Sequence, residues 1–200
     1  GGTNGVPVPA DFDGDGKADP AVYERTLGRW RIRGSTAGNY SVTFGSKSWV
    51  PVPADFDGDG KDDLAIYYPA LGDWYILHSS TGRSTRRHLG WETTRPVPAD
   101  YDGDGKADLA VYHSYSGDWY ITYSSDMKVR KIHLGWRQTL PVAADYDGDG
   151  KDDLAVYHVT SGDWYLRYSS DGQVRKPNLG GPGFNPAHLH TLVHDWFALP

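Results

Sequence analysis

The sequence contains no cysteine and a single methionine among its 200 residues. The absence of cysteine excludes disulfides and thiolate metal sites. A secreted protein without disulfides needs another means of stabilising its fold, and a bound metal ion is one such means. No run of eighteen apolar residues occurs, so the sequence predicts no membrane-spanning segment.

The sequence also lacks the signatures of two large functional classes. Its formal charge of −6 provides no basic face for nucleic acid. It has no Gly-x-Ser-x-Gly elbow, no phosphate-binding loop and no unique pair of acids outside its repeats. Catalysis normally needs one asymmetric set of groups, so we predict a protein that is not an enzyme. The chain opens with Gly1-Gly2-Thr3 and no initiator methionine, and we expect a processed product whose export signal has been removed.

The sequence does contain an internal repeat, which is the main signal of its organisation. Eight Trp and fourteen Tyr accompany frequent Gly and Pro, a composition typical of short strands and tight turns. The pattern Asp-x-Asp-Gly-Asp-Gly-Lys-x-Asp occurs four times, at spacings of 44, 45 and 45 residues. Pro-Val precedes each copy, and Gly-Asp-Trp-Tyr and then Leu-Gly follow three of them, the first unit being divergent. The repeat units span about residues 6–49, 50–94, 95–139 and 140–180.

Each unit is expected to form four short strands. In the third unit these cover residues 96–99, 109–113, 118–123 and 128–134, because these runs are bounded by turn-forming residues. Four strands in about 45 residues is the size of a propeller blade. We therefore predict an all-β fold, a β-propeller of four four-stranded blades over residues 1–180.

The last twenty residues, 181–200, do not continue the repeat. Asn185 and Pro186 resemble the start of a helix, and apolar residues follow at helical spacing. We expect a short amphipathic helix that docks on or closes the propeller. The alternative is a strand that completes another blade.

The acidic loop itself predicts a metal site. Its carboxylates at positions 1, 3, 5 and 9 repel one another unless a cation neutralises them. Calcium prefers flexible cages of six to eight oxygen atoms. Glycine at position 6 permits a sharp bend with positive φ, and the lysine at position 7 offers only its main-chain carbonyl, its ammonium pointing to solvent. Position 12 lacks the Glu of an EF-hand, because Val22, Ile66, Val111 and Val156 stand there.

A strand, this acidic loop and a Leu-Ala-Val-Tyr strand together resemble the FG-GAP/VCBS repeats of integrin-α-type β-propellers, over residues 6 to about 180. The resemblance implies about four calcium ions, one per repeat, and an extracellular or cell-surface setting. Blades of that family are usually longer and number seven, and Pro20 replaces the leucine of the other units. The aspartate ligands it implies are Asp11, Asp13, Asp15, Asp19, Asp55, Asp57, Asp59, Asp63, Asp100, Asp102, Asp104, Asp108, Asp145, Asp147, Asp149 and Asp153. The carbonyl ligands it implies belong to Lys17, Lys61, Lys106 and Lys151.

The recurring aromatic residues favour packing over ligand binding. Trp30, Trp74, Trp119 and Trp164, with Tyr75, Tyr120 and Tyr165, recur in register and are interpreted as contacts between blades rather than as sugar platforms. Trp91 and Trp136 follow the Leu-Gly turn, lie in connections, and are the better candidates for stacking on sugars.

The histidines give a weaker signal. His88 and His133 are equivalent repeat positions, as are His113 and His158, which predicts strand surface. His188, His190 and His194 form only a weak candidate for zinc.

These observations favour a secreted, non-enzymatic, calcium-stabilised propeller that acts in adhesion or ligand recognition. Its candidate partners are a carbohydrate, as in a lectin, or a cell-surface protein, and the calcium is interpreted as structural. One alternative is a structural subunit that self-assembles into rings or filaments through its end blades or C-terminal segment. Another is an accessory domain of a larger exported enzyme.

Overall fold

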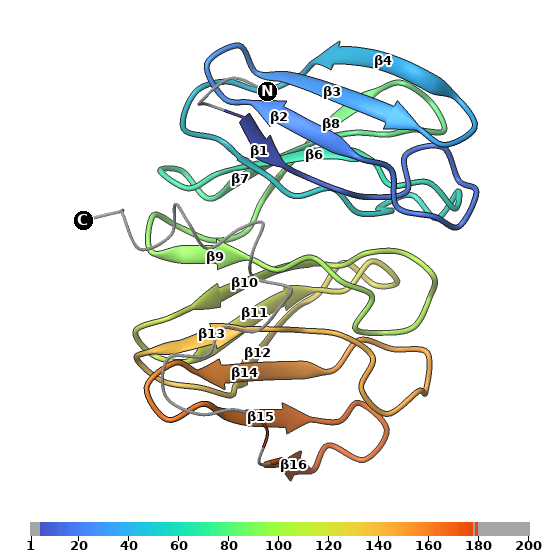
Figure 1. The fold of residues 1–200 in the computed structure, drawn as a ribbon. Coiled ribbons are helices and arrows are strands. Elements are labelled where there is room, and N and C mark those ends of the chain that lie inside the picture. The colour runs from blue at the N-terminus through green and yellow to red at the C-terminus, as the bar shows by residue number, and fades with distance from the viewer. Residues whose placement is uncertain (1–4, 178, 180–200) are drawn as a thin grey trace. The chain divides into compact units, whose positions relative to one another are not determined.

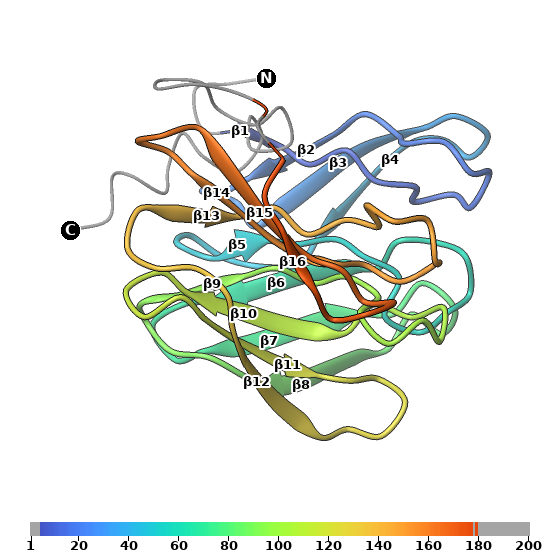
Figure 2. The ribbon, with the colours of Figure 1, turned by 90° about the horizontal axis from the view of Figure 1, so that it is seen from below.

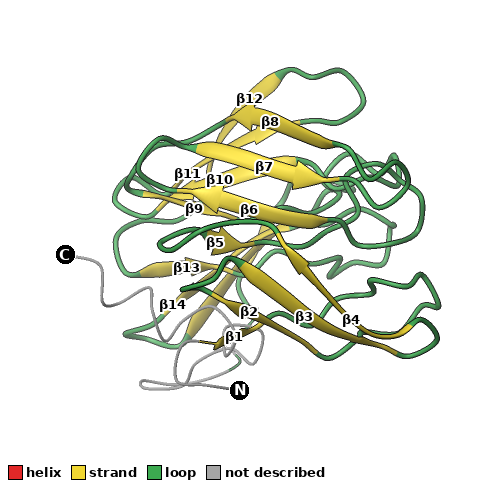
Figure 3. Cartoon of the chain, turned by 90° about the horizontal axis from the view of Figure 1, so that it is seen from above, coloured by secondary structure: helices red, strands yellow, loops and turns green. Residues whose placement is uncertain are grey.

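A computed structural model describes residues 5–177 and residue 179. These residues form strands and turns and contain no helix, as the cartoon coloured by secondary structure shows (Figure 3). The described residues accordingly offer no helical segment of the length and apolar character that a membrane crossing requires. The expected helix within residues 181–200 and the histidines at 188, 190 and 194 lie outside the described residues.

The described strands form four antiparallel sheets of four strands, each built in chain order (Figure 1). We call these sheets blades 1 to 4. Blade 1 contains β1 (Gly5–Pro7), β2 (Ala21–Glu24), β3 (Arg29–Gly34) and β4 (Gly38–Thr43), and blade 2 contains β5 (Val50–Pro51), β6 (Leu64–Tyr68), β7 (Asp73–Leu77) and β8 (Ser84–His88). Blade 3 contains β9 (Thr94–Pro96), β10 (Leu109–His113), β11 (Asp118–Thr122) and β12 (Val129–His133), and blade 4 contains β13 (Thr139–Pro141), β14 (Leu154–His158), β15 (Asp163–Arg167) and β16 (Val174–Arg175). The predicted fold class, four four-stranded blades of a β-propeller, is confirmed.

The chain divides into two compact units, Gly1–Glu92 and Thr93–Pro200. The first unit holds blades 1 and 2. The second holds blades 3 and 4, whose strands run from green through yellow to red in Figure 2.

One strand prediction was wrong by two residues. The first strand of the third unit is β9 at Thr94–Pro96 and not residues 96–99, because it pairs with β10 from Thr94↔His113 to Pro96↔Val111. Val97 still donates its N–H to the Ala110 carbonyl oxygen, but Pro98 has no N–H with which to continue the ladder. The chain pairs again only at an isolated bridge between Ala99 and Asp108. The other three strands of this unit lie at or within their predicted limits.

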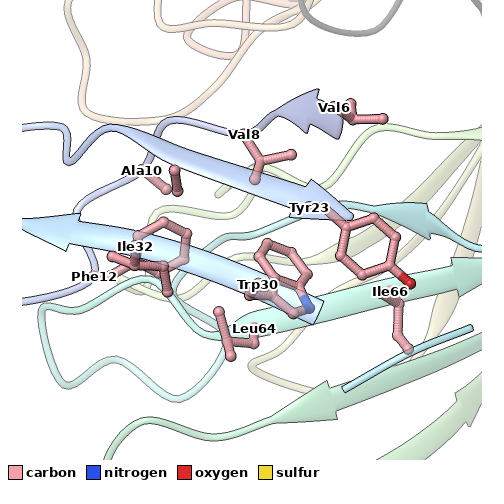
Figure 4. Close-up of a cluster of buried hydrophobic side chains, with 10 residues drawn as sticks. Val6, Val8, Ala10, Phe12, Tyr23, Trp30, Ile32, Leu64 and Ile66 are labelled. Atoms are coloured by element: carbon pink, nitrogen blue, oxygen red, sulfur yellow. The ribbon is translucent and has the colours of Figure 1, made fainter. Parts of the chain in front are cut away.

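The core of the first unit is built around a buried tryptophan. Trp30 has no exposed surface, and its Nε1 donates a hydrogen bond to the Phe44 carbonyl oxygen. The ring of Tyr23 lies 5.1 Å away, and Leu64 and Ile66 of blade 2 belong to the same cluster (Figure 4). Large aromatic rings supply most of the buried area of such a core.

The other repeat tryptophans follow the same plan with one exception. Trp74 and Trp119 are fully buried, and each donates its Nε1 hydrogen to the carbonyl oxygen of the leucine in the following Leu-Gly pair. The predicted packing role therefore holds for these residues and for Trp30. Trp164 in blade 4 is only partly buried.

Candidate metal centres

Each acidic loop connects the first and second strands of a blade and curls around its own first aspartate. In blade 1 the Asp11 carboxylate accepts hydrogen bonds from the backbone N–H groups of Gly14 and Gly16, both at 2.7 Å. The two glycines have φ of 79° and 81°, which a residue with a side chain adopts only at a cost. The predicted positive φ at position 6 is confirmed in all four loops, at Gly16, Gly60, Gly105 and Gly150.

The aspartate at position 9 fastens the acidic loop to a second turn of the same blade. In blade 3 the Asp108 carboxylate accepts hydrogen bonds from the N–H groups of Tyr101 (2.9 Å) and Ser124 (2.7 Å). Ser124 lies in the turn between the third and fourth strands. Burial raises the pKa of Asp108 to about 6, and the like charges of Asp102 and Asp100 act in the same direction. The equivalent residues Asp19, Asp63 and Asp153 are also fully buried.

A pair of hydroxyl residues in that second turn belongs to the site and was missed by the sequence analysis. In blade 2 the Ser79 hydroxyl lies 2.9 Å from the Asp59 carboxylate, and the Ser80 hydroxyl donates to Asp57 at 2.5 Å. Blades 3 and 4 repeat both contacts through Ser124, Ser125, Ser169 and Ser170. The signal was present in the sequence, because the serines follow their aspartates by 20 and 23 residues in each of these blades.

The structure brings most of the predicted ligands into groups that could hold a metal ion. Within each group the candidate ligand atoms lie within 4.8 Å of one another. The groups are Asp11, Asp13 and Asp15; Asp55, Asp57 and Asp59; Asp57, Asp63 and His78; Asp100, Asp102 and Asp108; and Asp145, Asp147 and Asp153. Asp19, Asp104 and Asp149 belong to none of these groups.

Two carboxylate oxygens in the first unit fit a cation site for a separate reason. Oδ1 of Asp13 and Oδ1 of Asp57 are buried and have no hydrogen-bond partner within the described part of the chain. A buried polar atom without a partner is costly, and an ion or water normally satisfies it. Both oxygens are at position 3 of their loops, and a hard cation that takes oxygen ligands suits them.

Blade 2 differs from the others by a histidine beside its acidic loop. His78 Nδ1 lies 3.3 Å from Asp63 Oδ2, and its Nε2 lies 2.9 Å from the Thr85 hydroxyl. The equivalent residues of the other blades are Gly34, Tyr123 and Tyr168. Sequence reasoning missed His78 because it does not recur, and periodicity carries no signal for a residue that occurs once.

The lysines of the loops behave partly as predicted. In every loop the lysine N–H donates to the carboxylate at position 5, for example from Lys17 to Asp15 at 2.9 Å. The Lys17 ammonium also contacts Asp15 at 2.9 Å while its side chain stays 74% exposed. Hydrogen bonds from Ser35 and Lys17 lower the pKa of Asp15, so the carboxylate is ionised at neutral pH.

Exposed aromatic rings lie in the connections that follow the Leu-Gly turns. Trp91 is 40% exposed and Trp136 is 39% exposed. The Trp136 ring packs edge-on against Tyr165 of blade 4, with centroids 4.8 Å apart, and lies 5.3 Å from His158.

The strand histidines lie where the repeat predicted. His88 and His133 are exposed, and their Nδ1 atoms lie 3.3 Å from Asp73 and 3.1 Å from Asp118. His113 and His158 are half-buried, with Nδ1 2.8 Å and 2.7 Å from serine hydroxyls.

The four-stranded blades and their acidic loops define a repeat protein of the β-propeller class. An FG-GAP-like repeat model matches residues 100–156, and an FG-GAP repeat model matches residues 49–84. Residues 49–84 and 100–156 therefore contain FG-GAP repeats. A search of curated protein sequences found no match.

Several solved structures share the fold. A lectin of Agrocybe aegerita, described as recognising non-reducing terminal N-acetylglucosamine, has a TM-score of 0.62 at 18% identity, over 87% of this chain and 52% of its own. The virginiamycin B lyase of Staphylococcus aureus has a TM-score of 0.59 at 10% identity, over 89% and 58%. A streptogramin B lyase has a TM-score of 0.58 at 10% identity, over 86% and 54%. The chain therefore spans about half the length of these structures.

Proposed function

We propose that the acidic loops bind calcium and that the ions stabilise the blades. The sixteen aspartates and four lysine carbonyls named from the resemblance are the proposed ligands. The buried, unpartnered oxygens of Asp13 and Asp57 support this proposal because a cation would satisfy them. The matches to FG-GAP repeat models over residues 49–84 and 100–156 support calcium over other hard cations.

We further propose that the protein is an extracellular, non-enzymatic module that recognises a carbohydrate ligand. The exposed ring of Trp136 is the observation that carries this proposal. Tyr165 and His158 pack against this ring while Trp136 stays 39% exposed, which leaves part of it for stacking on a sugar. Nearby, the Lys176 ammonium lies 3.0 Å from Asp163 and 5.1 Å from the Tyr165 ring centroid, which places polar groups beside the aromatic surface. Such a combination of apolar platform and polar groups is typical of small-ligand sites.

A glycan array with the intact chain tests the ligand class. Glycans ending in N-acetylglucosamine are the first to examine, because the lectin of similar fold recognises that sugar. Trp136→Ala should reduce binding about tenfold or more, since aromatic stacking residues carry much of the energy of a site. Leu71→Ala is the control, because Leu71 is 55% exposed but lies in the turn between β6 and β7 and not in a connection between blades. Binding of no glycan, or equal binding by the Trp136→Ala chain, would remove the carbohydrate proposal.

A second candidate function is that of a self-assembling structural subunit or of an accessory domain of a larger exported enzyme. The observation that favours it is that this chain aligns with only about half of each solved structure of similar fold. Sedimentation of the chain with calcium separates the alternatives. A species larger than a monomer at micromolar concentration supports assembly, and a strict monomer removes it.

A further inference from the structure

The acidic loops differ from one another at position 8 in a way that alternates along the chain. Blades 1 and 3 have alanine there, Ala18 and Ala107, whereas blades 2 and 4 have aspartate, Asp62 and Asp152. The metal-ligand positions 1, 3, 5 and 9 are the same in all four loops. Position 8 therefore distinguishes blades 2 and 4 from blades 1 and 3, although their predicted aspartate ligands are the same.

Asp62 reaches out of its own blade and holds the loop of blade 1. Its Oδ2 accepts a hydrogen bond from the Asp11 N–H at 2.7 Å. Its own N–H donates to the Asp11 carbonyl oxygen, also at 2.7 Å. One residue thus engages both backbone polar groups of position 1, the aspartate around which the blade 1 loop curls.

The second unit repeats this contact with different residues. Asp152 Oδ2 accepts from the Asp100 N–H at 2.9 Å, and the Asp152 N–H donates to the Asp100 carbonyl oxygen at 2.7 Å. The same geometry in two separate units indicates a rule of the repeat and not an accident of one loop.

The lysine that directly precedes each of these aspartates packs against the same preceding loop. A Cβ built on Gly14 would lie 2.9 Å from Cγ of Lys61, and a Cβ built on Gly103 would lie 2.9 Å from Cγ of Lys151. The aliphatic part of each lysine therefore lies directly over the preceding loop, where only glycine leaves room for it. Such contacts fix the backbone of the preceding loop without offering it a metal ligand.

We propose that Asp62 and Asp152 are positioning residues for the metal loop of the preceding blade, so that the loops act as two pairs, 1 with 2 and 3 with 4. The inference rests on the proposed function, since it concerns loops that bind calcium. Groups that orient metal ligands without touching the metal typically change metal affinity by about 10- to 100-fold when removed. A contact shared by two loops couples their metal affinities, and the coupling free energy is the same in both directions.

Calcium titration of the full chain by calorimetry tests the proposal with three variants. Asp62→Ala should weaken the blade 1 site about tenfold, and alanine at position 8 is compatible with the loop because Ala18 and Ala107 stand there naturally. Asp62→Asn keeps an oxygen acceptor for the Asp11 N–H and should restore most of the affinity. In a chain that already carries Asp15→Ala, which disables the blade 1 site, Asp62→Ala should change the remaining affinities little. Asp152→Ala should repeat the effect on the blade 3 site.

The outcomes separate this inference from the proposed function. If the unaltered chain binds no calcium, both fail. If it binds calcium but Asp62→Ala weakens calcium binding equally with and without Asp15→Ala, then Asp62 supports its own loop and the proposed pairing is wrong. If Asp62→Asn is as damaging as alanine, charge rather than the hydrogen bond matters, which also overturns the proposal. Hydrogen exchange at the Asp11 amide without calcium, expected to accelerate in Asp62→Ala alone, checks the contact independently of the metal and of a general loss of folding.

Discussion

Glycines with the same backbone conformation have unequal importance within one blade. Gly72 and Gly82 of blade 2 have φ of 70° and 64°. A Cβ on Gly72 would overlap the Gly90 carbonyl oxygen, whereas a Cβ on Gly82 would meet nothing within 4 Å. We predict that Gly82→Ala lowers the free energy of unfolding by about 1 kcal/mol, the cost of the left-handed conformation. Gly72→Ala should lower it by about 3 kcal/mol or more, because backbone must also move. Chemical denaturation measures both, and equal losses would contradict the close approach at Gly72.

The tryptophans give a second pair of residues for comparison. Trp119 is fully buried and Trp91 is 40% exposed. Trp119→Ala should lower the free energy of unfolding by about 3–5 kcal/mol, since it leaves a large cavity and an unpaired Leu134 carbonyl oxygen. Trp91→Ala should cost less than about 1 kcal/mol. Urea titration followed by circular dichroism checks both values, and a Trp91→Ala chain as unstable as the Trp119→Ala chain would assign both rings to the core.

At the residue scale the sequence analysis succeeded for glycines and tryptophans that recur in the repeats and missed His78, which occurs in one blade. The positive φ at position 6 and the burial of Trp30, Trp74 and Trp119 were predictable because four copies displayed the same pattern. His78 and Asp62 were not, since His78 occurs in one blade and Asp62 recurs only in every second loop, as Asp152. The partner of Asp62 also lies far along the chain, 51 residues away at Asp11, and no periodicity marks such a contact.

At the scale of the element, the acidic loop and the serine turn form one unit. Asp104 accepts hydrogen bonds from the Lys106 N–H (3.0 Å) and the Ser124 hydroxyl (2.7 Å), so it joins the two turns of blade 3. Asp104→Ala should remove one calcium ion of about four and loosen blade 3, leaving the other sites able to bind. Calorimetric stoichiometry counts the ions, and hydrogen exchange locates the loosened blade. Loss of all sites at once would show that calcium binding in blades 1 and 2 depends on blade 3. That result would contradict two separate pairs of loops.

The strands were predictable to within a residue or two, and their exact pairing was not. The limits of β10, β11 and β12 follow from runs rich in β-branched and aromatic residues between turn formers. The position of β9 depends on which residue of β10 stands opposite Pro96, and that register is a property of the pair. The serines of the second turn were missed although their spacing from the aspartates recurs, because the sequence does not show that this turn folds against the acidic loop.

At the scale of the whole molecule, calcium should control stability. Each bound ion adds about 2.7 kcal/mol when calcium is a hundredfold above its dissociation constant. One kcal/mol shifts the Tm of a protein of this size by about 2–4 °C. Chelation should therefore lower the Tm by on the order of 10 °C or more, measured by calorimetry in calcium and in chelator, with magnesium as the control ion. Coincident melting curves would show that the acidic loops are solvated turns without a resident ion.

The ladders of hydrogen-bonded strands bear on how such a chain changes length over evolution. Among the described residues every sheet is a meander of consecutive strands, and no strand is shared between blades. Duplicating or deleting a segment of about 45 residues therefore adds or removes a complete sheet without cutting a ladder elsewhere. If Asp62 and Asp152 hold their loops in pairs, two sheets rather than one are the number that is added or removed. Gain or loss of two sheets together would keep each of these aspartates next to the loop that it holds. We therefore expect such chains to differ in length by even numbers of sheets.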